Sequence, residues 1–107
     1  AMYQPIAGIH HVTAIASDPQ RNLRFYEDDL GLRLVKTTVN FDDPGTYHLY
    51  FGDDHGQPGT ILTFFPWVGA LPGRAGTGMT QATAFQVPPG SLDYWMGRFA
   101  DRAIDFE

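Results

Sequence analysis

A strand-then-helix pattern occurs twice in this 107-residue chain, about 70 residues apart. The first copy places "TAI" at Thr13 ahead of the helical segment "NLRFYEDDLGL", and the second places "TAF" at Thr83 ahead of "SLDYWMGRFAD". Agreement in both the segments and their order favours a duplicated module. The second copy reaches "AIDFE" where its next strand would begin, so about one and a half modules are present. Because an uncompleted sheet has exposed edges, we expect either a fragment or a chain that completes its sheet with a partner.

The first copy predicts the element order βαβββ. Runs of apolar and β-branched residues predict four strands, at residues 9–16, 32–41, 46–51 and 60–65. The turns "DDPG" and "GDDHGQPG" separate the last three of these strands. An apolar stripe of Leu23, Tyr26 and Leu30 predicts a helix between the first two strands, and Ser17 or Asp18 is placed to cap it.

A Gly- and Pro-rich segment at residues 67–78 predicts a linker between a first module, 1–66, and a partial second module, 79–107. In the second module we expect a strand at residues 80–87 and a helix capped by Ser91. The sequence therefore predicts an α+β fold, in which a βαβββ module is followed by the first βα of a second one. Its mainly antiparallel sheets are expected to curl around a cleft.

Charge and composition exclude several classes of partner. The net charge is −5 and the seven basic residues are scattered, which is unlike a nucleic-acid-binding or membrane-binding surface. No apolar run approaches the roughly 20 residues of a membrane span. The chain contains no cysteine, which excludes disulfides and thiolate chemistry and is typical of a cytoplasmic protein. The segment "GRAGTG" lacks the Lys-Ser/Thr of a phosphate loop, so no nucleotide cofactor is expected.

Two adjacent histidines, His10 and His11, stand at the start of the first predicted strand. Adjacent side chains of a strand point to opposite faces, so only one of the two can face a given site. His11 shares its face with Thr13, whereas the small apolar residues of the other face suit packing beneath the helix. Without cysteine, a metal site would be built from imidazole and carboxylate groups, which suits Fe, Mn, Zn or Ni.

A resemblance to the vicinal oxygen chelate superfamily runs through the stretch "GIHHVTAIASDPQRNLRFYEDDLGLRLVKTTVNFDDPGTYHLYFGDDHGQPGTILTFFPW". This superfamily includes glyoxalases, bleomycin-resistance proteins and extradiol dioxygenases. The frame of His11, Asp18, Phe25 and Tyr26 belongs to the superfamily at large. The segments "LGLRLVKTTVNFDDPGTYHLYFGD" and "PGTILTFFPW" are similar to its hydroquinone-cleaving, ring-opening dioxygenases.

The resemblance implies an enzyme that inserts O2 into a small hydroquinone-like or catecholic aromatic with the help of a divalent metal. Fe(II) is the expected metal, with Mn, Zn or Ni as alternatives. In such proteins the histidine seven positions before the aspartate is a metal ligand, which here is His11, before Asp18. His10 is then expected to be structural or to lie at the mouth of the strand.

The remaining metal ligands of such a site are missing from the matching positions. The resemblance places a glutamate in the fourth strand, where this chain has Leu62 or, in the favoured register, Thr63. It places a second histidine in the first strand of the second module, where this chain has Gln81 or Ala82. We therefore expect the other ligands to come from a second copy, as a homodimer, or from a missing C-terminal half, and the chain alone to be a weak metal binder with little turnover.

His48, in the third predicted strand, is the candidate catalytic residue, as an acid–base group near the substrate. The interpretation that we favour for its ring is a hydrogen bond within the sheet. His55, in a polar turn beside Asp53 and Asp54, is expected to be exposed to solvent. Two positions are possible for the rings of Phe64, Phe65 and Trp67: they are expected either to wall the cleft or to lie in the core.

Two other functions agree with the same resemblance. A non-catalytic binding protein of the bleomycin-resistance type would need a cleft at a dimer interface and no metal. A metalloenzyme of the glyoxalase or isomerase type would need glutamate ligands from paired modules, which Thr63 does not supply.

Overall fold

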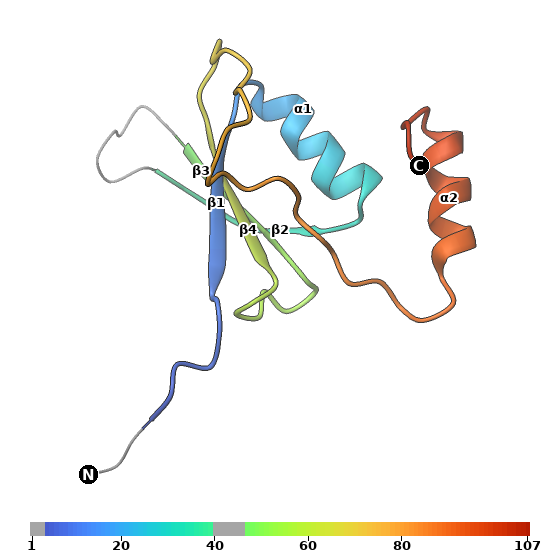
Figure 1. The fold of residues 1–107 in the computed structure, drawn as a ribbon, viewed down its shortest axis with the longest axis horizontal. Helices are drawn as coiled ribbons and strands as arrows, with labels where there is room; N and C mark the ends of the chain where they lie inside the picture. The colour runs from blue at the N-terminus through green and yellow to red at the C-terminus, as the bar shows by residue number, and fades with distance from the viewer. Residues whose placement is uncertain (1–3, 40–46) are drawn as a thin grey trace. The chain divides into compact units, whose positions relative to one another are not determined.

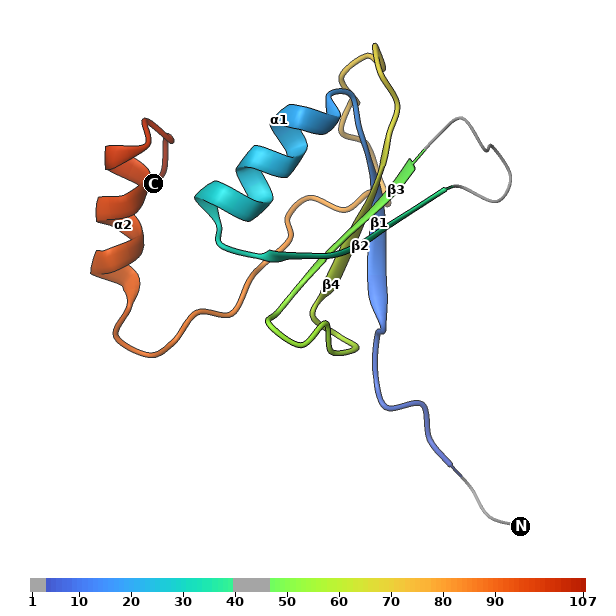
Figure 2. The same ribbon diagram turned by 180° about the vertical axis from the view of Figure 1, so that it is seen from behind.

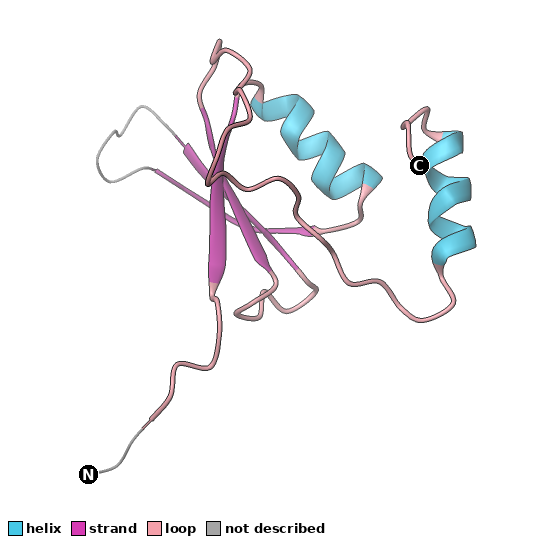
Figure 3. Cartoon of the chain, viewed as in Figure 1, coloured by secondary structure: helices cyan, strands magenta, loops and turns pink. Residues whose placement is uncertain are grey.

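The computed structural model describes residues 4–39 and 47–107, which fall into two compact units, 1–71 and 72–107. The expected α+β class is confirmed, since both strands and helices are present (Figure 1, Figure 3). The elements are β1 (His11–Ala16), α1 (Pro19–Leu23), the π-helical turn η1 (Arg24–Asp29), β2 (Arg33–Val39), β3 (Tyr47–Gly52), β4 (Ile61–Pro66) and α2 (Leu92–Asp101). The predicted turn at 42–45, with residues 40, 41 and 46 of the flanking strands, lies outside the described residues.

The first unit contains one four-stranded sheet in the order β1-β4-β3-β2. β1 runs parallel to β4, whereas β4 with β3 and β3 with β2 are antiparallel pairs. β4 and β3 therefore occupy the centre, and β1 and β2 form the two edges (Figure 1). The parallel pairing brings the first and last strands of the module side by side, so residues 50 positions apart in sequence become neighbours.

The core lies on one face of this sheet, beneath α1 and η1. Its buried residues come from the two central strands: Leu49, Phe51, Leu62 and Phe64. The ring of Tyr26, from η1, lies 5.5 Å from the ring of Phe51 and 4.8 Å from that of Phe64. Figures 1 and 2 show the helix on this one side of the sheet only.

Local signals explain where the first helix begins and ends. Asp18 is the N-cap, because the backbone N–H groups of Gln20 and Arg21 donate to its Oδ1 at 3.0 and 3.1 Å. Of the two capping residues considered, the aspartate has this role. Gly31 ends the helix with a φ of +76°, a conformation that glycine adopts without strain.

The second unit contains α2 but not the strand expected at residues 80–87. A strand exists only by backbone hydrogen bonding to a neighbour, and no neighbouring strand is described for this segment. Ser91 does precede α2, but its Oγ donates to the carbonyl oxygen of Pro88 at 2.6 Å and makes no capping bond. No described helix is long and apolar enough to cross a membrane.

Candidate functional site on the face opposite the helix

Strand alternation gathers the polar side chains of the sheet on the face that the helix does not cover. Thr13 of β1 and Tyr50 of β3 both lie opposite Thr63 of β4, and Lys36 of β2 lies opposite Tyr50. Residues two positions away on the same strands share that face. We call this surface the polar face, and it comprises His11, Thr13, Lys36, His48, Tyr50, Thr63 and Phe65.

Thr63 is the centre of the polar face. Its side chain is fully buried, with 0% exposure. Its Oγ1 lies 2.6 Å from Oγ1 of Thr13 and 2.8 Å from Nε2 of His48. Hydrogen bonds to two neighbouring strands satisfy the buried hydroxyl, whose burial would otherwise be unfavourable. These bonds place Thr63, and not Leu62, on the same face as Thr13 and His48.

The ring of His48 lies within a row of aromatic side chains. It stacks on Phe65, with ring centres 4.0 Å apart and an interplanar angle of 21°, and it lies 4.3 Å from the ring of Tyr50. Burial lowers the pKa of His48 below its ordinary value of 6.5, and the charges of His11 and Lys36 lower it further. The hydrogen bond that we expected within the sheet is the bond to Thr63.

A cation lies at the far end of this row. The Nζ atom of Lys36 lies 4.4 Å from the centre of the Tyr50 ring, within the range of a cation–π contact. Lys36, Tyr50, His48 and Phe65 thus cross β2, β3 and β4 in sequence. The row presents one positive charge and flat aromatic surfaces on the polar face.

His10 and His11 do not separate to opposite faces as the strand alternation predicted. Their Nδ1 atoms are 3.1 Å apart and their rings meet edge to face. The reason is that β1 begins at His11, so His10 lies outside the strand and its alternation. Both side chains are exposed, and the role of His10 in the fold comes from its carbonyl oxygen, which accepts a hydrogen bond from the backbone N–H of Gly59 at 2.8 Å.

The contact between the two rings indicates which nitrogen of His11 can act as a ligand. One Nδ1 atom must donate and the other must accept. If the Nδ1 of His11 donates to His10, then its Nε2 carries a lone pair that can bind a metal.

The described residues do not form a complete metal site. No group of three His, Asp or Glu side chains comes together among residues 4–39 and 47–107. The position expected for a glutamate is filled by Thr63, which is already bonded to Thr13 and His48. The Nε2 atom of His48 is engaged in the second of these bonds. The described residues therefore do not fit a three-ligand centre by themselves.

The turn between β3 and β4 is structural. The backbone N–H groups of His55 and Gln57 donate to Oδ1 of Asp53, both at 3.0 Å. These bonds lower the pKa of Asp53, and the bond from Gln57 has the largest effect. The side chain of His55 is exposed, as expected. Of the three aromatic rings left open by the sequence, Phe64 is in the core, Phe65 is on the polar face and Trp67 is exposed.

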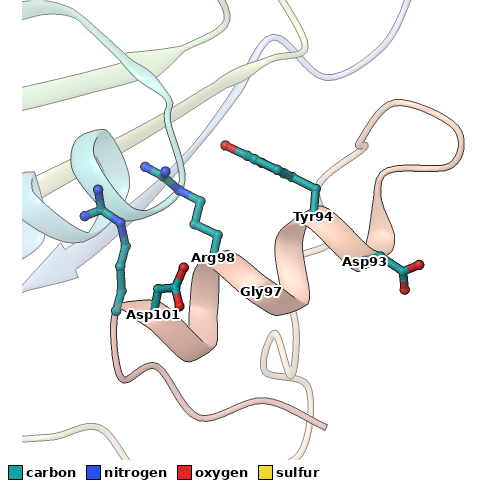
Figure 4. A pocket seen from close by; sticks show the side chains of 6 residues that line it. Asp93, Tyr94, Gly97, Arg98 and Asp101 are labelled. Carbon is teal, nitrogen blue, oxygen red and sulfur yellow. The ribbon is translucent and has the colours of Figure 1, made fainter.

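A pocket in the second unit is formed by α2 and the residue that follows it, Arg102. Its lining residues are Asp93, Tyr94, Gly97, Arg98, Asp101 and Arg102. Figure 4 shows the side chains of Tyr94 and Arg98 extending from the same side of the helix, one turn apart. Because one helix and its C-cap residue supply every lining group, the pocket has no second wall within this unit and we assign it no function.

Sequence reasoning missed the hydrogen-bonded chain of Thr13, Thr63 and His48 and the position of Lys36. The signal that was available is the parity of the strands, which places these residues on alternate positions. What parity cannot supply is the parallel pairing of β1 with β4, which brings Thr13 to Thr63.

The comparisons with known proteins identify the family of this chain. The family model of the Glyoxalase/Bleomycin resistance protein/Dioxygenase superfamily matches residues 8–95, so the chain belongs to this superfamily. A Bacillus subtilis (strain 168) protein named "Putative ring-cleaving dioxygenase MhqE" is 58% identical over 100 residues, which is 94% of this chain and 33% of that protein.

Two further proteins that this chain matches are also named as dioxygenases. A "Chlorohydroquinone/hydroquinone 1,2-dioxygenase" of Sphingobium indicum is 37% identical over 92% of this chain and 32% of that protein. A crystal structure of a dioxygenase-like protein from Bacillus subtilis subsp. subtilis str. 168 superposes with a TM-score of 0.89 at 55% identity, over 94% of this chain and 32% of that chain. The chain therefore spans about a third of the length of the relatives that it matches.

Proposed function

We propose that this chain forms part of an Fe(II)-dependent ring-cleaving dioxygenase that acts on hydroquinone-like or catecholic aromatics. The observation that carries the proposal is the 58% identity, over 94% of the chain, to a protein named as a ring-cleaving dioxygenase. The polar face supports it, because an exposed imidazole, a cation and flat aromatic rings suit a small oxygenated aromatic molecule.

In this proposal His11 supplies one metal ligand through Nε2, with the ring oriented by the contact of its Nδ1 with His10. His48 is the candidate acid–base group. Its lowered pKa favours the neutral ring at neutral pH, and a neutral imidazole can accept a proton.

The other ligands are proposed to come from outside these 107 residues. A facial site for Fe(II) needs two histidines and one carboxylate, and the described residues supply one candidate. A second copy of the chain in a homodimer, or further sequence such as the rest of the relatives' length, would supply the remaining groups and cover the open edge of β1.

The proposal is tested by adding Fe(II) and hydroquinone to the purified chain under air, with His11→Ala and His55→Ala as a matched pair. We expect weak Fe(II) binding that His11→Ala abolishes and His55→Ala leaves unchanged, and little oxygen uptake by a monomer. Tight one-to-one binding of Fe(II) by a strict monomer would contradict the partial ligand set.

The same preparation distinguishes the proposed enzyme from a binding protein. A metal-free chain whose melting temperature rises with aromatic ligands, and does not respond to Fe(II), would support the non-catalytic alternative. A rise in melting temperature that requires both the metal and the aromatic ligand would support the dioxygenase.

A further inference from the structure

Thr63 has one hydroxyl hydrogen and two hydrogen-bond partners. The partners are Oγ1 of Thr13 at 2.6 Å and Nε2 of His48 at 2.8 Å. Because Thr63 is fully buried, its hydrogen must be donated to one of the two. The three side chains therefore form a directional chain that runs across β1, β4 and β3.

The hydroxyl hydrogens of this hydrogen-bond chain can be arranged in two directions, and each direction gives the buried Thr63 hydroxyl both a donor and an acceptor. In the first, Thr13 donates to Thr63, Thr63 donates to Nε2 of His48, and the ring carries its hydrogen on Nδ1. In the second, the Nε2–H group of His48 donates to Thr63, Thr63 donates to Thr13, and the hydroxyl hydrogen of Thr13 points outward. A protonated His48 has hydrogens on both ring nitrogens, so it permits only the second direction.

We propose that Thr63 is a positioning residue. It couples the presence of a hydrogen on Nε2 of His48 to whether the Thr13 hydroxyl donates or accepts a hydrogen bond. Thr13 is exposed on the same face as His11, so its hydroxyl is accessible to a ligand bound there. When Nε2 of His48 carries a hydrogen, Thr13 offers a donor to the ligand. When Nε2 accepts, Thr13 offers a lone pair instead. A ligand oxygen that accepts from Thr13 would therefore favour the Nε2–H form of His48.

Among the described residues, the other groups around His48 do not provide this coupling by another route. The charged or titratable neighbours that affect it are Lys36 on β2 and His11 on β1, while Tyr50 lies beside it on its own strand. β4 contributes the stacked ring of Phe65 and the hydroxyl of Thr63. Of these groups, Thr63 is the one bonded to Nε2. The inference rests on these bonds and does not depend on the proposed activity.

Thr13→Val removes the hydroxyl at the β1 end of the hydrogen-bond chain, with Thr13→Ser as the matched control. Valine retains the size and β-branching of threonine at an exposed strand position, so the fold is expected to persist. Without the Thr13 hydroxyl, Thr63 can donate only to Nε2 of His48. The pKa of His48 is then expected to fall, because a protonated ring would leave the Thr63 hydrogen without an acceptor.

The measurement is a pH titration of the histidine nitrogens by NMR on the 107-residue chain, with His48→Gln used to assign the signals. In Thr13→Val we expect a lower pKa for His48 and about a tenfold excess of the Nδ1–H tautomer, while Thr13→Ser behaves as wild type. An unchanged pKa in Thr13→Val, or a neutral ring that carries its hydrogen on Nε2, would overturn the proposal. Thr13→Ile removes the same hydroxyl and replaces the valine variant if that variant does not fold.

Discussion

At the residue scale, the polar face is organised by Thr63. A buried hydroxyl at the centre of the sheet is stable here because Thr13 and His48 bond to it from both neighbouring strands. These bonds and the ring of Phe65 hold His48 in one place. The surroundings also disfavour the charged form of His48, which lowers its pKa. His11, two residues before Thr13, is the exposed imidazole of the same face.

Protonation of His48 is expected to destabilise the fold. Because its pKa is lower in the folded chain than its ordinary value of 6.5, the unfolded chain binds the proton more readily. The free energy of unfolding should therefore fall as the pH decreases below 6.5, until the folded-state pKa is passed. Urea denaturation of wild type and His48→Gln across this range checks the sign. If the free energy of unfolding changed equally with pH in the two proteins, the predicted role of His48 would be wrong.

At the element scale, short-range signals determine the separate helices and strands of the first module, and long-range pairing determines how its strands are ordered in the sheet. The cap at Asp18, the stop at Gly31 and the alternation of the strands are local features, and each was readable in the sequence. The strand expected at 80–87 is not formed, because none of the described strands pairs with that segment. His10 lies at the mouth of the strand, as expected, but its ring does not alternate with that of His11, because β1 begins one residue later, at His11.

The cap of α1 can be tested with a neighbouring control. Asp18→Ala removes the acceptor for two backbone N–H groups and should reduce the free energy of unfolding by about 1 kcal/mol. Ser17→Ala, one position earlier, should change it by less than about 0.5 kcal/mol, because Ser17 is exposed and does not cap the helix. Chemical denaturation of both variants measures the difference, and equal losses would show that the cap is not specific.

The two faces of the central strands should respond differently to truncation. Phe51→Ala removes a core ring with 0% exposure and is expected to reduce the free energy of unfolding by about 3–5 kcal/mol, enough to prevent folding of a small domain. Phe65→Ala should be tolerated better, because that ring is partly exposed on the polar face, and it should raise the pKa of His48 toward its ordinary value by uncovering the ring. Circular dichroism and NMR titration measure the two effects. A milder loss for Phe51→Ala than for Phe65→Ala would contradict the assignment of the core.

At the scale of the whole molecule, the chain is one sheet-and-helix unit with a second, smaller unit that contains α2. The superfamily and the α+β class could be predicted from the sequence, because the motif around His11 and the strand pattern lie within about 60 residues. The ligand set could not be completed, since no group of three metal-binding side chains comes together in the described part of the chain.

The open edge of β1 is expected to cause association. Val12 and Ile15 on this strand are 53% and 65% exposed, and its outer backbone groups face no further strand of the sheet. Light scattering should show a mass that rises with protein concentration, and Val12→Lys should reduce this rise by adding an edge charge on the face away from His11. A wild-type chain that stays monomeric at every concentration would remove the homodimer from the proposed ways of completing the site.

The central claim is that His11 is the metal-binding group of the polar face, and Mn(II) line broadening in NMR spectra of the 107-residue chain tests it most directly. We predict that trace Mn(II) broadens the signals of His11 and its neighbours on β1 first, and that His11→Ala removes this effect while His55→Ala does not. Broadening centred on the exposed turn at His55, or unchanged by His11→Ala, would contradict the account.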